Sequence, residues 1–474
     1  MHSTVFERSQ PDPGIVSHAL AASRLQPFWL DGLRIESWPR LESVERFDLV
    51  VVGGGYTGLW TALLAKQRDP EARVAILEAR TVGWAASGRN GGFVEASLTH
   101  GESNGENRFA KELPQLNRLG MENLDEIEKT IADNGWDCDF ERTGTLSVAI
   151  EPHQVADLRE GHNGVTELFL DTAEVRAQLN SPTYLAGLWS ARSTGLVHPG
   201  KLVAELARAC AEAGVEIFER SPVRGIDSKS AEGDEVLVET LHGSAYAKKV
   251  ALATNAFPSI LKRFRLHTVP VYDYVLMTEP LSDEQLASIG WSNRQGVSDL
   301  ANQFHYYRLS ADNRILWGGY DAVYRFGGKI KPEYDDRPRT FETLAAHFFS
   351  TFPQLAGVRF THRWSGVIDT STRFCAFFGQ ARQGRVSYAA GFTGLGVAAT
   401  RFAANVMLDQ LAGLETERTS LDMVRSIPLP FPPEPAAYLG VQATRWALNR
   451  ADHNEGKRNL LLKSLDAVGL GFDS

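Results

Sequence analysis

Residues 47–92 constrain the fold of this chain more than any other part of the sequence. They open with residues 47–52, an apolar and β-branched run typical of a strand buried on both faces of a parallel sheet. Gly53, Gly55 and Gly58 follow in GxGxxG spacing. Glycines at these places allow a tight turn, close approach to a pyrophosphate and close packing of a helix on the strand. We therefore predict a strand–turn–helix unit that binds a dinucleotide.

The residues after this turn support the prediction. A helix is expected at about residues 57–66, and the amides of its first turn, at Tyr56 and Thr57, would point at the phosphates. A second strand, residues 73–77, leads to Glu78, which follows the last motif glycine by 20 positions. An acid at about this spacing binds the ribose hydroxyls of an unphosphorylated dinucleotide. Because strand, helix and acid accompany the glycines, a plain glycine turn is disfavoured, but FAD and NAD both remain open.

Composition narrows the classes of partner. The 474 residues are enough for two or three domains. The chain has 58 acidic and 49 basic residues, and its formal net charge of −9 argues against a nucleic-acid partner. Three widely spaced cysteines form no disulfide or metal-binding pattern, and twelve histidines show no HExxH spacing, so we expect no metal site. The sequence shows neither a secretory leader pattern nor a membrane-spanning run. We expect a cytoplasmic protein and make no prediction of its oligomeric state.

Nucleotide-binding elements recur in separated parts of the chain, which predicts two interleaved domains in an α/β fold. The Rossmann-like domain takes residues 47–100, 190–268 and 366–415. The second domain, of α+β type and built on an antiparallel sheet, takes residues 101–189 and 269–365. Residues 1–46 are expected to lie over the surface as an N-terminal extension. Residues 416–474 form a C-terminal extension, in which a helix near residues 438–449 is expected as a packed cap or partner contact rather than a membrane-surface helix.

A second glycine-rich segment, GWAASGRNGG at residues 83–92, resembles the second flavin-contacting loop of the D-amino-acid oxidase and glycine oxidase superfamily of FAD enzymes. The likeness is greatest to its gamma-glutamylputrescine oxidoreductase-like branch. Further matches are GLVHPGKL at 195–202, ATNA at 253–256, RWSG at 363–366 and GFTGLGV at 391–397. The resemblance spans about residues 47–413 and implies FAD rather than NAD.

The resemblance also implies the residues around the flavin. Glu78, Ala79 and Arg80 would hold the ribose side, and Val223 would bind the adenine through its backbone. Ala253 and Thr254 would lie near the phosphates. The pyrophosphate and isoalloxazine would be lined by Ala86, Ser87, Gly88, Arg89, Asn90 and Gly91. Beyond Gly391, the amides of Gly394, Leu395, Gly396 and Val397 begin the last long helix, where they can stabilise negative charge on a reduced flavin.

Two departures from the family pattern indicate how the flavin is attached and which substrates are disfavoured. Sarcosine-oxidase-like relatives bind flavin covalently through a cysteine near the position of Gly366, so the glycine here predicts noncovalent FAD. Amino-acid-oxidising relatives carry an arginine just after the Trp-x-Gly segment to clamp the substrate carboxylate. Ile368 takes that place, which argues against a simple glycine or D-amino-acid oxidase. Arg308 or Arg373 could bind an acidic group from another direction.

Catalytic residues are expected in the aromatic region between residues 270 and 368. Amine oxidation needs an aligned C–H bond and a dry pocket more than a strong base. The predicted catalytic set is His305, Tyr306, Tyr307, Arg308 and Trp364, with Tyr272 and Tyr274 as further candidates for an aromatic box. For each ring, packing in the core is an equally open interpretation.

The predicted function is FAD-dependent oxidation of a C–N bond in a primary or secondary amine. The resulting imine is hydrolysed, and the electrons pass to oxygen or another acceptor. Three alternatives remain at this point. The protein could be an amino-acid or N-methyl amino-acid oxidase or dehydrogenase of the same superfamily, an NAD-linked dehydrogenase, or a non-catalytic flavin-binding subunit of a larger dehydrogenase.

Overall fold

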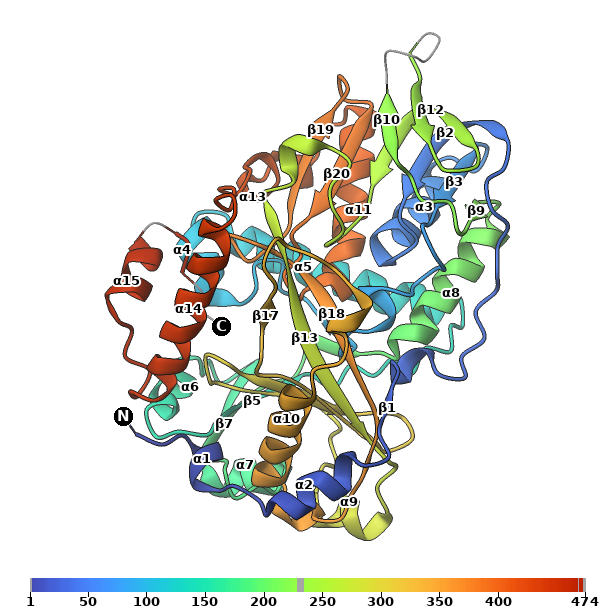
Figure 1. Ribbon diagram of the computed structural model, residues 1–474. Coiled ribbons are helices and arrows are strands. Elements are labelled where there is room, and N and C mark those ends of the chain that lie inside the picture. The colour runs from blue at the N-terminus through green and yellow to red at the C-terminus, as the bar shows by residue number, and fades with distance from the viewer. Residues whose placement is uncertain (1, 228–233, 468, 472–474) are drawn as a thin grey trace.

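Two large β-sheets, which the chain enters alternately, organise the protein (Figure 1). The computed structural model describes residues 2–227, 234–467 and 469–471. A short third sheet pairs β4 (Phe93–Glu95) with β8 (Thr194–Leu196) in antiparallel fashion. None of the described helices is both long and apolar enough to cross a membrane.

The first sheet has eight strands in the order β10–β11–β12–β2–β3–β9, with β20 paired to β12 and β19 to β20. Its strands are β2 (Val44–Val52), β3 (Val74–Leu77), β9 (Glu216–Phe218), β10 (Gly225–Asp227), β11 (Val236–Glu239), β12 (Ser244–Leu252), β19 (Phe377–Ala381) and β20 (Val386–Ala390). The central strands β12, β2, β3, β9 and β20 pair in parallel. Their apolar side chains are buried against α3 (Tyr56–Arg68), α8 (Pro199–Glu212) and α11 (Gly396–Ala412). The predicted Rossmann-like α/β fold is confirmed.

The second sheet has ten strands in the order β1–β18–β13–β16–β15–β14–β5–β7–β6, with β17 paired to β13. Its strands are β1 (Arg24–Leu25), β5 (Thr145–Ala149), β6 (Glu167–Leu170), β7 (Ala186–Ser190), β13 (Thr268–Thr278), β14 (Gly296–Asp299), β15 (His305–Leu309), β16 (Ile315–Gly319), β17 (Val323–Tyr324) and β18 (Phe360–Ser371). All pairs are antiparallel except β1–β18 and β14–β5. One face packs against α10 (Pro338–Thr351), where Phe348 and Trp317 belong to an aromatic core.

Strands of the two sheets alternate along the chain in the order that interleaved domains predict, although the exact domain boundaries stay a prediction. β18 remains in the second sheet as far as Ser371, beyond the predicted boundary at 366. The predicted segment 190–268 includes residues 228–233, which lie outside the described part of the chain.

Further helices lie between the strands of the two sheets and after α11. They are α4 (Glu102–Phe109), α5 (Leu113–Asp133), α6 (Gln154–Glu160), α7 (Thr172–Gln178), α9 (Asp283–Ile289), α12 (Glu417–Ser420) and α13 (Asp422–Arg425).

Both terminal extensions are built into the body. The first contains α1 (Val5–Arg8) and α2 (Pro13–Leu20), and its strand β1 pairs with β18 at the edge of the second sheet. Trp29 in this extension is buried, so residues 1–46 contribute to the core as well as covering the surface. The second extension ends in α14 (Ala436–Asp452) and α15 (Leu460–Ala467), which lie side by side at the flank of the molecule (Figure 1).

Candidate active site

A single cavity of about 1960 Å³ joins the carboxyl ends of the parallel strands to the second sheet and the C-terminal helix α14. Of the residues predicted to bind the cofactor, the following line it: Gly53, Gly55, Tyr56, Thr57, Glu78, Ala79, Arg80, Ala86, Ser87, Arg89, Asn90, Gly91, Val223, Ala253, Thr254, Gly394, Leu395, Gly396 and Val397. Gly58, Gly88 and Gly391 do not reach the cavity wall. The structure thus gathers four separated segments of the predicted FAD site at one place.

The first glycine turn is packed too tightly for side chains. Gly53 has a φ of +113°, and a Cβ atom there would collide with the carbonyl oxygen of Ala253. A Cβ atom on Gly58 would collide with the carbonyl oxygen of Gly53, so Gly58 serves the close packing of α3 on β2. Tyr56 and Thr57 follow in the first turn of α3, with that helix N-terminus facing the cavity.

Glu78 stands at the end of β3 and organises the neighbouring loop. Its Oε2 atom accepts a hydrogen bond from the amide of Gly54 at 2.7 Å. Its Oε1 atom accepts from the amide of Arg80 at 2.8 Å and from the indole nitrogen of Trp84 at 2.9 Å. A carboxylate has about four acceptor positions, so Glu78 retains capacity for a ribose hydroxyl.

The loop at residues 86–92 is closed by its own hydrogen bonds. Ser87 Oγ accepts from the amide of Tyr56 at 2.9 Å, which ties the second glycine loop to the first. Asn90 donates to the carbonyl oxygens of Ala86 at 3.0 Å and Ser87 at 2.9 Å, and it accepts from the amide of Gly92 at 2.8 Å. These bonds fix the shape of the loop.

Arg89 points out of this loop toward the second sheet. Its guanidinium donates to the carbonyl oxygens of Trp84 at 3.0 Å and Ser365 at 3.1 Å, and it forms an ion pair with Asp335 at 3.1 Å. Arg89 lines the cavity, but its described bonds join the loop to β18. Its charge is therefore paired rather than free to bind an anion.

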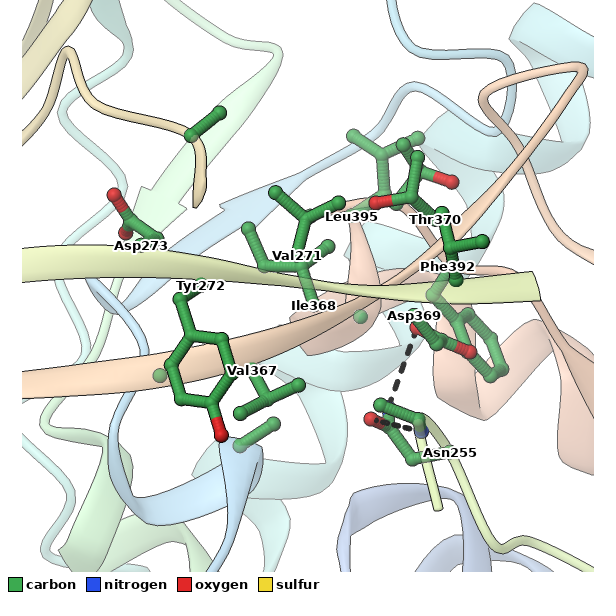
Figure 2. Close-up of a pocket in the computed structure, with 18 of the residues that line it drawn as sticks. Asn255, Val271, Tyr272, Asp273, Val367, Ile368, Asp369, Thr370, Phe392 and Leu395 are labelled. Atoms are coloured by element: carbon green, nitrogen blue, oxygen red, sulfur yellow. Dashed lines mark hydrogen bonds between the residues drawn. The ribbon is translucent and has the colours of Figure 1, made fainter. Parts of the chain in front are cut away.

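Asp369 fixes the turn that precedes α11. Its Oδ2 atom accepts a hydrogen bond from the amide of Gly391 at 2.6 Å, and Figure 2 shows its contact with Asn255, whose Nδ2 lies 3.4 Å from Oδ1. Burial raises the pKa of Asp369 to about 7. The sequence does not indicate a role for Asp369, because its link to Gly391 arises only when β18 and the turn before α11 come together.

The residues present fit FAD. The N-termini of α3 and α11 both face the cavity, as dinucleotide phosphates and a reduced flavin require. Nothing lies closer than 3.9 Å to the position of a Cβ atom on Gly394 or Gly366, so the backbone at both cavity-lining glycines is open to a bound group. Glu78 would supply an acceptor for a ribose hydroxyl. Among the described residues, no group of His, Cys, Asp and Glu could hold a metal ion.

Of the five predicted catalytic residues, Tyr306 alone lines the cavity. Its ring lies between two glycines: a Cβ atom on Gly91 would come within 2.7 Å of Cε2, and one on Gly318 within 2.6 Å of Cζ. Its hydroxyl donates a hydrogen bond to the carboxylate of Asp273. Tyr306 therefore connects the flavin-binding loop to the second sheet.

His305 and Tyr307 point to the opposite face of β15 and belong to the core. His305 is bonded to Asp299 at 2.7 Å and to His347 at 3.0 Å. The hydroxyl of Tyr307 lies 2.6 Å from that of Tyr184. Neither ring lines the cavity. The alternation of β15, which sends neighbouring side chains to opposite faces, separates both from Tyr306.

Arg308 and Arg373 are both buried, and each donates to several backbone carbonyl oxygens. Arg308 donates to the carbonyl oxygens of Gly92 at 3.2 Å and Val197 at 2.7 Å. Arg373 donates to that of Met423 at 2.8 Å, among others. Neither lines the cavity, so the structure does not bring either to a substrate carboxylate.

Trp364 and Tyr274 do not line the cavity either. The indole of Trp364 donates to the carbonyl oxygen of Arg89 at 2.8 Å, and the hydroxyl of Tyr274 to that of Tyr334 at 2.8 Å. Tyr272 does line the cavity, and its hydroxyl accepts from the amide of Lys331 at 3.1 Å. Tyr272 belongs to the core cluster on the side of β13 opposite to Asp273, so the structure does not bring it together with Tyr306 in an aromatic box.

Two cavity acids complete the site and were not singled out in the sequence. Figure 2 shows Asp273 and Val271 on one side of β13, with Tyr272 on the other. Asp273 pairs across the sheet with Gly366, and Val271 pairs with Ile368. Burial raises the pKa of Asp273 to about 6. Glu95, at the end of β4, is the second acid, and burial raises the pKa of its carboxyl as well.

Comparison with known proteins places this arrangement in a family. The family model described as DAO, FAD dependent oxidoreductase, matches residues 48–410. The chain belongs to this family and is an FAD-dependent oxidoreductase, which confirms the resemblance, the cofactor and the enzyme class expected from the sequence. An NAD-linked dehydrogenase and a non-catalytic subunit are thereby set aside.

Particular relatives share most of their length with this chain. It is 32% identical to the gamma-glutamylputrescine oxidoreductase of Escherichia coli, over 81% of this chain and 88% of the relative. It is 31% identical to the probable oxidoreductase OrdL of Haemophilus influenzae, over 81% of this chain and 87% of the relative. The crystal structure of glycine oxidase from Geobacillus kaustophilus superposes with a TM-score of 0.66, at 20% identity, covering 81% of this chain and 100% of that one. That structure has the same fold.

Proposed function

We propose that this enzyme oxidises a C–N bond in a primary or secondary amine that lacks an α-carboxylate. The observation that carries the proposal is the position of Asp273, an acid bonded by Tyr306, whose ring packs against Gly91 of the predicted flavin-binding loop. A carboxylate at this place attracts a cationic amine and repels a substrate carboxylate. The E. coli relative, whose name specifies gamma-glutamylputrescine, is consistent with an amine substrate.

Two of the cationic side chains of the cavity wall are already engaged by acids. Arg89 is paired with Asp335 at 3.1 Å, and Arg445 with Asp321 at 2.5 Å. Ile368 presents an alkyl side chain where amino-acid-oxidising relatives carry an arginine. A buried carboxylate on the substrate would thus meet apolar surface and acids rather than a bidentate partner.

When bound, FAD supplies the group that accepts the hydride. The protein orients the amine: Asp273 accepts an N–H hydrogen bond, and its raised pKa makes it a better proton acceptor than an ordinary aspartate. Tyr306 stays protonated, because burial and the adjacent acid raise its pKa well above the usual value, so it keeps donating to Asp273. Val271 and Ile368 make the neighbouring wall apolar, which limits the access of water to the reacting carbon.

The imine product is hydrolysed to an aldehyde or ketone, and the electrons pass to oxygen or to another acceptor. FAD is held noncovalently. All three cysteines are buried free thiols, which fits a protein of the reducing cytoplasm.

Anaerobic mixing of the oxidised holoenzyme with a substrate panel tests the proposal. The panel contains primary alkylamines, N-methyl alkylamines, glycine, sarcosine and D-alanine. Bleaching of the flavin absorbance by alkylamines, at lower concentration than by any amino acid, is the expected result. Preferential bleaching by glycine, sarcosine or D-alanine would instead support the amino-acid or N-methyl amino-acid oxidase of the same superfamily.

A further inference from the structure

Glu95 is a cavity acid without a partner. It occupies the last position of β4, lines the cavity, and makes no side-chain hydrogen bond or ion pair with any described residue. Burial raises the pKa of its carboxyl. Glu95 is partly buried, and a carboxylate partly withdrawn from water is stabilised by a paired cation, so this position favours a ligand that brings one.

Two threonines of neighbouring strands line the cavity near Glu95. Thr194 lies directly opposite it in the β4–β8 pair. The carbonyl oxygen of Thr194 accepts from the amide of Gly144 at 3.0 Å, which brings the start of β5 alongside. The adjacent Thr145 lines the cavity, and its Oγ1 atom is buried without a hydrogen-bond partner among the described residues. An acid and an unsatisfied hydroxyl at one place form a polar subsite able to bind an ammonium group.

Two aromatic rings connect this subsite to Asp273. Phe93 precedes Glu95 by two positions on β4, so both side chains point to the same face. The ring of Phe93 meets that of Tyr306 edge-to-face at a centroid distance of 5.9 Å, and Tyr306 bonds Asp273. An alkyl chain laid along these rings would have one carboxylate near each end.

We propose that Glu95 anchors a second cationic group of the substrate, so that the substrate class is a diamine or polyamine. The inference rests on the proposed function, because it assumes that the other amine is the one oxidised beside Asp273. Among the described residues, no base forms an ion pair with Glu95: of the cavity-wall bases, Lys331 pairs with Glu333 at 2.8 Å, Arg89 with Asp335 at 3.1 Å and Arg445 with Asp321 at 2.5 Å.

Steady-state kinetics with a matched pair of amines gives the first test. The wild-type holoenzyme is expected to show a KM for 1,5-diaminopentane about tenfold below that for n-pentylamine, the size of effect of one charge-assisted hydrogen bond. Glu95→Gln is expected to abolish this difference. Glu106→Gln, on the exposed side of α4, changes the net charge equally and should preserve it. A preference for the diamine that survives in Glu95→Gln overturns the inference.

A binding measurement separates the inference from the proposed function. Calorimetric titration of the oxidised holoenzyme compares 2,6-dimethylheptane-2,6-diamine with 2-methylhexan-2-amine, which keep their ammonium N–H donors but have no hydrogen on the carbon beside nitrogen and so cannot be oxidised there. About tenfold tighter binding of the dication by the wild type, lost in Glu95→Gln, supports the subsite. Equal binding of the two cations by the wild type overturns the inference, even if alkylamines bleach the flavin. Failure of every amine to bleach the flavin would overturn the proposed function, and the titration would still decide on Glu95.

Discussion

The hydroxyl of Tyr306 donates to the carboxylate of Asp273 across an intervening strand. Tyr306 lies on β15 and Asp273 on β13, and β16 runs between them. The bond is possible because β16 carries Gly318 at the crossing, where a Cβ atom would come within 2.6 Å of the tyrosine ring. Tyr306 also packs against Gly91 of the flavin-binding loop. One side chain thus fixes an acid in the sheet relative to the cofactor site.

Loss of the hydrogen bond between Tyr306 and Asp273 should shift the acid limb of the pH profile to higher pH. Tyr306→Phe is expected to lower kcat/KM about tenfold, as for one hydrogen bond to a charged group. The phenol lowers the pKa of Asp273 against the effect of burial, so its removal raises that pKa further. Activity, which requires the carboxylate, will then be lost at a higher pH on the acid side. Profiles of kcat/KM against pH measure the shift.

Tyr307→Phe is the matched control for this change. Tyr307 is the next residue, but its hydroxyl bonds Tyr184 in the core, 2.6 Å away. This variant should lose stability without moving the acid limb of the profile. An equal shift in both variants would contradict the assigned role of Tyr306.

Asp273→Asn tests the acid itself. In the wild type, kcat/KM should rise with pH as the carboxyl ionises near its pKa of about 6. The asparagine has no such ionisation, so this limb should vanish and kcat/KM should fall about 100-fold or more, the usual scale for a general base. A profile that keeps its limb near pH 6 in Asp273→Asn would assign the ionisation to another group.

Asp369 should control the affinity for FAD rather than the chemistry. Asp369→Ala removes the acceptor that holds the amide of Gly391 at 2.6 Å, so the turn before α11 loses its fixed shape. We expect the Kd for FAD to rise about tenfold, with a smaller rise for Asp369→Asn, which keeps an acceptor oxygen. Recovery of fluorescence on flavin release measures this. Unchanged affinity in the alanine variant would show that the turn holds without Asp369.

Gly440 tests the part that α14 plays in the site. It lines the cavity, and no atom lies within 4 Å of the position of its Cβ. Gly440→Leu should stabilise the helix by about 1 kcal/mol and raise KM for long amines more than for short ones. Gly440→Ala is the control, since it gives the helix gain with little added volume. A rise in Tm without any change in KM would remove α14 from the substrate path.

Denaturing precipitation distinguishes noncovalent from covalent FAD. Cys138, Cys210 and Cys375 are buried, and no cysteine is among the described residues that line the cavity. Gly366 does line it, at the place where some relatives carry the attaching cysteine. After precipitation with acid, the yellow colour should stay in the supernatant. A yellow pellet would show a covalent bond.

The sequence identified the family and the cofactor because the residues of the predicted FAD site lie in short contiguous motifs, most of which line one cavity. Gly53 and Glu78 are placed by one strand–turn–helix unit, and local spacing is enough to relate them. Asp273 and Glu95 could not be assigned in the same way, because their surroundings come from strands far apart in the chain. Tyr306 could be named, although not distinguished from its neighbours.

A local signal for that distinction was present. Residues 305–309 form a strand, so side chains alternate between its two faces, and His305 and Tyr307 must share the face opposite to Tyr306. Arg308 shares the face of Tyr306, yet it lies under the backbone of Gly92 and Val197 rather than in the cavity. Arg308 is kept out of the cavity only because β15 packs against the region of β4. The spacing of residues in the sequence does not reveal that contact.

The most direct measurement of the central claim uses two compounds that differ only in an α-carboxylate. Oxidised holoenzyme is mixed without oxygen with n-pentylamine or with norleucine, in both enantiomers, and the rate of flavin reduction is followed by its visible absorbance. The cavity acid Asp273 and the alkyl group of Ile368 predict faster reduction by n-pentylamine at every concentration. Faster reduction by either norleucine enantiomer would contradict the account and show that the enzyme binds an α-carboxylate.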